Sequence, residues 1–185
     1  MFNLKSKSAR KGTFLSDEKG SAAIETVIMV PLTFFVIMSM FTLFDAFRQY
    51  SMHQKAAYTL SDMISRETLP LDRDYLEGAH DLFDTLTRSP QDSTVRVSIL
   101  RYDANNDSMR LDWSKTSGFS TPLRDEDVRN WTDRLPMMVN NERIIVVETY
   151  ANYEPPFNTG LGTREIANFI FARPRYAPQV LWQNT

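Results

Sequence analysis

The longest apolar stretch of the chain runs from residue 22 to residue 44 and contains a single charged side chain, that of Glu25. A helix needs roughly 20 apolar residues to cross the hydrocarbon core of a bilayer. The stretch also lacks the polar face that a helix of a soluble domain usually shows. The pattern therefore predicts a transmembrane helix over residues 21–45, with Asp45 at its outer end.

The helical pattern continues past the membrane. Residues 45–67 contain no glycine or proline, and their apolar positions fall near helical spacing. We expect a helical stem over residues 46–69 that ends at Pro70. A second helix is predicted over residues 73–86, with one side formed by Leu76 (or Tyr75), Ala79, Phe83 and Leu86.

Alternating apolar residues then indicate strands. Residues 95–102 predict the first strand, residues 103–107 have turn chemistry, and residues 109–113 return as its hairpin partner. A short helix is expected over residues 125–135. The strongest strand signal covers residues 143–153, which are rich in β-branched and aromatic side chains, and residues 167–172 are a last candidate for pairing.

These elements predict an α+β fold in which one N-terminal transmembrane helix extends into a pilin-like stem packed on a small antiparallel sheet. The expected organisation is a basic leader (1–20), the membrane helix (21–45), the stem (46–69) and an extracytoplasmic α+β domain (70–185). At 185 residues the chain has room for the anchor and one modest domain.

Charge is distributed unevenly along the chain. Residues 1–19 hold five basic and two acidic side chains, a net charge of +3, which leaves −5 on the rest of a chain whose total is −2. Positive charge before the apolar helix predicts a cytoplasmic N-terminus and a domain facing the periplasm or the cell exterior. The acidic remainder gives no basis for binding nucleic acid.

Signals for catalysis or metal binding are weak. There is no cysteine, which excludes disulfides, thiolate metal sites and a thiol nucleophile. His53 and His80 fall on separate predicted helices, and we expect both to be solvated or partly buried structural residues. Asp103 and Asp107 resemble the start of a calcium loop, but Ser108 replaces its required glycine, so a hairpin turn is the better interpretation. We therefore expect no cofactor, no metal and no enzymatic activity.

A short motif surrounds the start of the apolar helix. Gly20 and Ser21 are followed by Ala22-Ala23, then by Glu25, and Pro31-Leu32 lies about two turns farther on. Glycine lets an extended backbone enter a protease cleft, and the basic residues before it hold that bond on the cytoplasmic side. A charged residue at the centre of a membrane helix costs about 2.5–3.5 kcal/mol, and less near the edge. Glu25 therefore needs compensation or a place at the headgroup boundary.

This motif resembles the class III prepilin signal, most closely that of TadE/TadF-like minor pseudopilins of the tight adherence (Tad/Flp) pilus, a branch of the type IV pilus systems. Gly20, Ala22, Ala23, Glu25, Pro31 and Leu32 carry the resemblance, which covers residues 10–45, and the late strand from Val146 to Tyr150 also looks similar. Thr26 departs from the pattern, since the major pilins usually have Tyr there and the minor ones often Phe.

The resemblance implies processing by a prepilin peptidase between Gly20 and Ser21. It implies that Glu25 docks against the N-terminal amine of a neighbouring subunit, while Pro31 can kink the helix. The implied partners are other pilins or pseudopilins and the Tad assembly platform, reached through a helix held in inner-membrane lipid, with entry into the pilus left open. An uncleaved single-pass anchor presenting a periplasmic binding domain and, less favoured, a hydrolase on a stalk are the alternatives.

Overall fold

The computed structural model describes residues 18–88, 93–118 and 120–183, with side chains from residue 23 onward. The first 17 residues of the expected leader lie outside this range. The described elements are α1 (Glu18–Ser65), α2 (Arg73–Thr87), β1 (Ser93–Asp103), β2 (Ser108–Gly118), α3 (Asp125–Val128), the 3-10 helix η2 (Trp131–Arg134), β3 (Arg143–Tyr153) and β4 (Arg164–Ala172). The α+β class is confirmed, with a long apolar N-terminal helix and a small antiparallel sheet.

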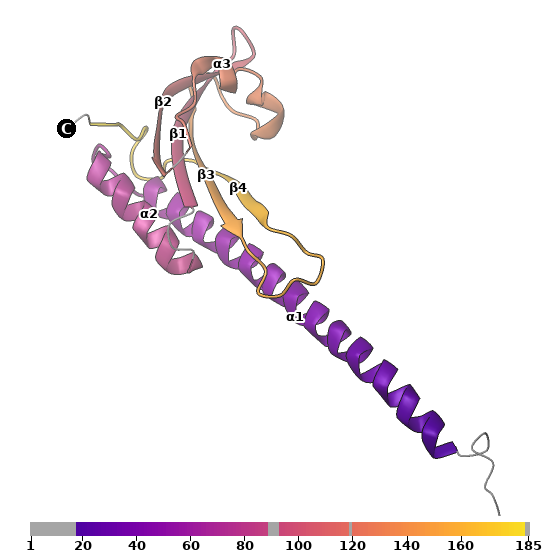
Figure 1. Cartoon of the computed structure of the whole chain (residues 1–185). Coiled ribbons are helices and arrows are strands. Elements are labelled where there is room, and N and C mark those ends of the chain that lie inside the picture. The colour runs from indigo at the N-terminus through magenta and orange to yellow at the C-terminus, as the bar shows by residue number, and fades with distance from the viewer. Residues whose placement is uncertain (1–17, 89–92, 119, 184–185) are drawn as a thin grey trace, which may run out of the picture.

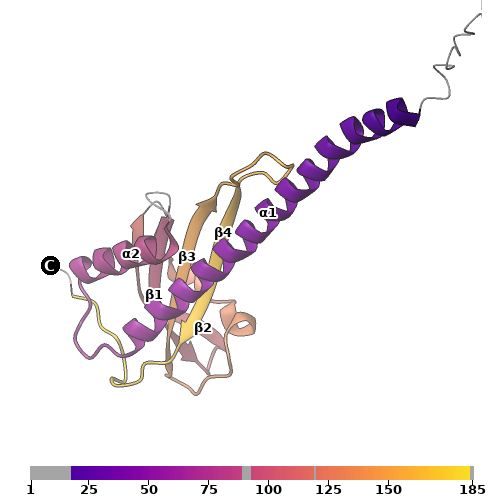
Figure 2. The same ribbon diagram turned by 90° about the horizontal axis from the view of Figure 1, so that it is seen from below.

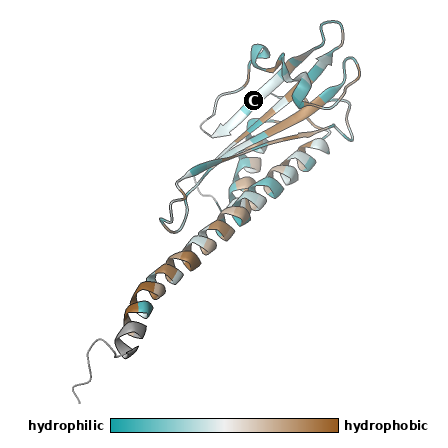
Figure 3. Ribbon diagram, turned by 90° about the vertical axis from the view of Figure 1, so that its right-hand side faces the viewer, coloured by the Kyte–Doolittle hydropathy of each residue, from teal (hydrophilic) through white to brown (hydrophobic). Residues whose placement is uncertain are grey.

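Helix α1 is one rod of 48 residues, which is about 72 Å long at a rise of 1.5 Å per residue. Its first part projects away from the rest of the chain, and its second part lies along the sheet (Figure 1). Hydrophobic residues dominate the projecting part (Figure 3). Hereafter residues 23–41 are the bare segment, and residues 42–183 form the globular domain.

The packed part of α1 presents a stripe of small and branched side chains to the domain. Ala57, Leu60 and Ile64 are fully buried at helical spacing. The helix ends at Ser65, earlier than the expected stem boundary at residue 69, because the amides of Arg66 and Glu67 turn back to the carbonyls of Met63 and Ile64. These bonds tighten the last turn and complete the carbonyl pairing before Pro70.

Helix α2 begins where the Asp72 side chain accepts a hydrogen bond from the Tyr75 amide at 2.8 Å, a helix N-cap. Its buried residues are Leu76, Ala79, Phe83 and Thr87. The expectation that Leu86 belongs to this face was wrong, since Leu86 is 41% exposed. Thr87 lies four residues after Phe83 and continues the stripe, whereas Leu86 falls at its edge.

The sheet has four antiparallel strands in the order β2-β1-β3-β4. Strand β3 coincides with its predicted range, and β1 and β2 form the predicted hairpin. Strand β2 continues five residues past its expected end at Trp113, as far as Gly118. These added residues are polar, and their ladder with β1 includes a hydrogen bond of 2.8 Å between the hydroxyls of Ser98 and Ser114.

Each face of the sheet has its own core. Helices α1 and α2 cover one face, where Val97, Ile99 and Val147 are buried (Figures 1 and 2). The connection between β2 and β3 covers part of the other face, burying Val128 and Leu135 against the sheet. The single helix expected over residues 125–135 is divided into α3 and η2, because both of these side chains turn into that second core.

Candidate functional site

The bare segment of α1 is largely uncovered by its own domain. Ile24, Val27 and Phe41 are 66%, 72% and 67% exposed, and only 6% of the most apolar 18-residue window is buried. A contiguous apolar surface that runs along about five turns of an exposed helix is uncommon on soluble monomers. In the described part of the chain, this N-terminal helix is the one that is long and apolar enough to span a membrane.

Two hydroxyl groups in and next to this segment are bonded to the backbone of the helix. The Ser39 hydroxyl donates to the carbonyl of Phe35 at 2.8 Å, and the Thr42 hydroxyl donates to that of Met38 at 2.9 Å. Such bonds allow a hydroxyl to enter lipid without an unsatisfied donor. Pro31 lies inside α1 and has no N–H to give to the helix, yet the helix continues on both sides of it.

The expected processing site lies at the beginning of α1. The helix starts at Glu18, so the backbones of Gly20 and Ser21 already belong to its first turns. Glu25 follows Ser21 by about one turn, which corresponds to a rise of about 6 Å. Its side chain is exposed, so the carboxylate is accessible to groups outside the chain.

A hydrogen bond fixes the point where the globular domain begins to cover α1. The Tyr153 hydroxyl at the end of β3 donates to the Asp45 carboxylate at 3.0 Å, and Thr42 is only 1% exposed beneath this strand end. Burial, assisted by the nearby Asp45 carboxylate, raises the pKa of Tyr153 to about 12. The phenol therefore remains a donor throughout the physiological pH range.

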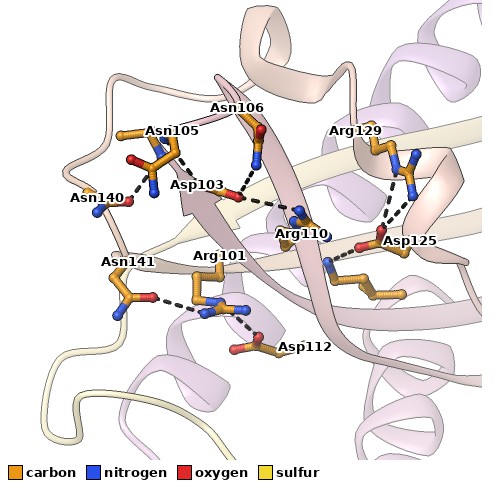
Figure 4. A network of polar contacts seen from close by, with 12 residues as sticks. Arg101, Asp103, Asn105, Asn106, Arg110, Asp112, Asp125, Arg129, Asn140 and Asn141 are labelled. Atoms are coloured by element: carbon orange, nitrogen blue, oxygen red, sulfur yellow. Dashed lines mark hydrogen bonds and ion pairs between the residues drawn. The ribbon is translucent and has the colours of Figure 1, made fainter.

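The hairpin turn between β1 and β2 is held by a polar network (Figure 4). Asp103 accepts hydrogen bonds from the Asn105 amide at 3.1 Å and the Asn106 side chain at 2.8 Å, and Arg110 lies 3.5 Å away. The Asn106 bond is the main cause that lowers the pKa of Asp103. Protein donors thus occupy this carboxylate, and the predicted hairpin turn is confirmed. Among the described residues, no cluster of three or more side chains could hold a metal ion.

His80 takes part in a serine and aspartate cluster that sequence reasoning missed. Its ring nitrogens lie 2.8 Å from the Ser117 hydroxyl and 2.7 Å from the Ser93 hydroxyl. Ser93 donates its proton to Asp84, whereas a catalytic serine must give its proton to the histidine. Ser93 is also only 2% exposed. The cluster therefore ties α2 to the start of β1 and the end of β2. Its residues do not form a local sequence motif, since His80 and Ser117 are 37 positions apart.

His53 lies between α1 and α2. It is 2% exposed, and its ring meets that of Phe83 edge-on at 5.6 Å. The expectation of a solvated or partly buried residue was therefore wrong, because α2 folds back over this part of α1. Burial lowers the pKa of His53, and the Asp84 carboxylate offsets only part of that effect.

No protein-family model, no curated protein and no solved structure matches the chain. Function is therefore inferred from the residues themselves. Of the predicted site residues, Gly20, Ser21, Glu25 and Pro31 all fall on the projecting part of α1. The histidine clusters and the hairpin network belong to the globular domain.

Proposed function

We propose that the chain is a minor pseudopilin, cut by a prepilin peptidase between Gly20 and Ser21, that assists assembly of a Tad-type pilus. One observation carries the proposal: α1 leaves an apolar segment bare, with an exposed carboxylate at Glu25 one turn after the proposed cut. Such a segment can be held in the lipid bilayer before assembly and can pack against the helices of other subunits during assembly.

Cleavage creates an α-amino group on Ser21, and Glu25 is its proposed electrostatic partner in a neighbouring subunit. Opposite charges attract strongly in a low-dielectric setting, but the cost of desolvating both limits the net gain. The pair therefore serves mainly to set the register between subunits. Before assembly, the amine of the same chain lies about one turn from Glu25, so the carboxylate can be compensated while the subunit waits in the membrane.

The proposed location is the bacterial inner membrane, with the basic leader in the cytoplasm and the globular domain in the periplasm. The proposal leaves open whether the protein stays there or enters the base or tip of the pilus. The +3 charge of residues 1–19 supports this orientation. We propose a role in assembly and not in catalysis, since His80, which contacts two serine hydroxyls, is arranged as a structural tie.

The second candidate is an uncleaved single-pass anchor that presents a periplasmic binding domain. One feature favours it: α1 begins at Glu18, so the Gly20–Ser21 bond is part of a helical turn. A peptidase would have to unwind that turn before cutting. Glycine lowers the cost of doing so, because it is a poor helix former by about 1 kcal/mol.

Processing separates the two candidates. The full chain is produced with and without a prepilin peptidase, and membrane-fraction protein is subjected to N-terminal sequencing. We expect the peptidase to yield a chain beginning at Ser21, and Gly20→Ala to block the cut. Gly78→Ala, a glycine substitution on α2 with open space around it, is the matched control and should be processed normally. A mature chain that keeps Met1 would establish the uncleaved anchor instead.

Assembly tests the role of Glu25. We expect Glu25→Ala to insert into the membrane normally but to reduce surface piliation and co-purification with other pilins. Glu77→Ala removes an exposed carboxylate from α2 and should leave piliation unchanged. Wild-type piliation in the Glu25→Ala strain would refute the proposed role of Glu25 in subunit docking.

A further inference from the structure

The loop between β3 and β4, residues 154–163, lies against α1 where the bare segment meets the globular domain (Figures 1 and 2). Pro156 and Phe157 line a groove of about 500 Å³ together with Phe41 and Phe44. Leu161 lines a second groove of about 410 Å³, with Leu43, Phe47 and Tyr50 on its wall. The loop thus contacts the same turns of α1 in two places.

These turns coincide with the expected membrane surface. A hydrocarbon core of about 30 Å takes roughly 20 helical residues, and counting from Ala22 such a span ends near Phe41. Thr42 is already buried by the domain. No flexible linker separates the expected membrane span from the globular domain, because α1 is continuous through this point. A span that ends at Phe41 therefore places the globular domain directly on the bilayer surface, with the β3–β4 loop as the part of the domain nearest to the membrane.

The chemistry of the loop suits the interface between lipid and water. Its ten residues carry one charge, at Glu154, together with two prolines, Phe157 and Leu161. Phe157 is 42% exposed and lines its groove with the apolar side chains of Phe41, Phe44 and Pro156 as well as with Asp45. Arg48 and Asp45 line the first groove, and Arg164 and Glu165 line the second. Both arginine side chains are exposed. Aromatic and basic side chains at this depth are typical of membrane-interface anchors.

We infer that the β3–β4 loop is a second membrane contact, in which Phe157 and Leu161 enter the headgroup region of the leaflet that α1 leaves, with Arg48 and Arg164 facing lipid phosphates. The inference rests on the membrane span in the proposed function. Lipid is favoured over a second copy of the chain because the loop continues the apolar surface of the bare segment at the point where α1 is expected to leave the bilayer. Two contacts, unlike one helix alone, fix the tilt of the domain on the membrane.

The chain has no cysteine, so single cysteines can be labelled without further changes. Asn158→Cys places a fluorophore at the tip of the loop and keeps its apolar side chains, and Phe157→Cys is the second loop position. Phe34→Cys marks the bare segment, and Met137→Cys marks an exposed site, 96% accessible, beyond the other end of the sheet. Each full-length protein is reconstituted in vesicles of phosphatidylethanolamine and phosphatidylglycerol at low protein density.

We expect headgroup-labelled quencher lipids to quench both loop labels, and acyl-chain-labelled quencher lipids to quench the label at position 34 near the centre of the span. Aqueous iodide should quench the loop labels several-fold less than the label at position 137. Quenching of position 34 by lipid, with a loop as accessible to iodide as position 137, would overturn the loop contact while leaving the span intact. Failure of lipid to quench position 34 would overturn the span and the proposed function with it. Protection of the loop labels from iodide that appears only at high protein density would identify a second copy as the occupant and would also overturn the inference.

Discussion

Replacing Glu148 with alanine is expected to destabilise the globular domain by about 3–5 kcal/mol, the cost of removing one partner from a buried ion pair. Glu148 on β3 faces Arg96 on β1 across the sheet, with 2.7 Å between the guanidinium Nε and the carboxylate. The two side chains are only 12% and 5% exposed. The Tyr150 hydroxyl, at 3.1 Å, also donates to this carboxylate.

The remaining contacts of Arg96 place the loss at the lower end of that range. In the alanine variant its guanidinium keeps hydrogen bonds to the Thr121 carbonyl at 3.1 Å and the Tyr150 hydroxyl at 3.0 Å. An apolar pair, Arg96→Met with Glu148→Leu, leaves no buried charge and should recover most of the stability. Since small domains are stable by only about 5–15 kcal/mol, the single variant loses a large share of the total.

The assay is urea unfolding of the full chain in lipid nanodiscs, followed by tryptophan fluorescence. Trp113, Trp131 and Trp182 all lie in the globular domain, so the signal reports on its unfolding. The control is Glu77→Ala, which breaks the Arg73–Glu77 pair on α2, where the side chains are 82% and 54% exposed; exposed pairs contribute at most about 1 kcal/mol. Equal losses for the two alanine variants would refute the buried-pair reasoning.

Two further predictions concern the same domain. Burial lowers the pKa of His53 below 6.5, so the unfolded chain takes up its proton first; stability should be full above pH 6.5 and fall as the pH drops toward the folded-state pKa. His53→Leu should flatten this slope in urea titrations, and an unchanged slope would assign it to other groups. Gly118 has φ +109°, and a Cβ there would lie 2.6 Å from the Ser93 carbonyl oxygen, so Gly118→Ala should cost about 1–3 kcal/mol. Gly78→Ala has open space in a helix and should gain about 0.5–1 kcal/mol; the opposite order of unfolding midpoints would contradict both assignments.

Elements with strong local patterns could be predicted from the sequence. The apolar run predicted α1, and the dense β-branched residues of β3 predicted its range. Residues 114–118 carry no strand pattern, since they become part of β2 only by pairing with β1. The division of residues 125–135 between α3 and η2 likewise depends on a core that the local sequence does not describe.

The candidate site shows the same division. Gly20, Ser21, Glu25 and Pro31 could be proposed as site residues from the sequence because their spacing is local. The contact of Tyr153 with Asp45 joins residues 108 positions apart, and the loop beside Phe41 depends on the full path of β3 and β4. Such contacts require the three-dimensional fold, so neither the boundary of the bare segment nor the loop contact could be predicted.

The unbroken course of α1 from Glu18 to Ser65 has a mechanical consequence. Each residue of an α-helix advances about 1.5 Å and turns about 100° around the axis. If neighbouring rods dock one residue out of step, the head at the far end must point in a different direction. In the proposed assembly, the direction of each globular domain would therefore depend on the register in which its α1 packs, and a force on the domain would be transmitted along the helix to that packing site.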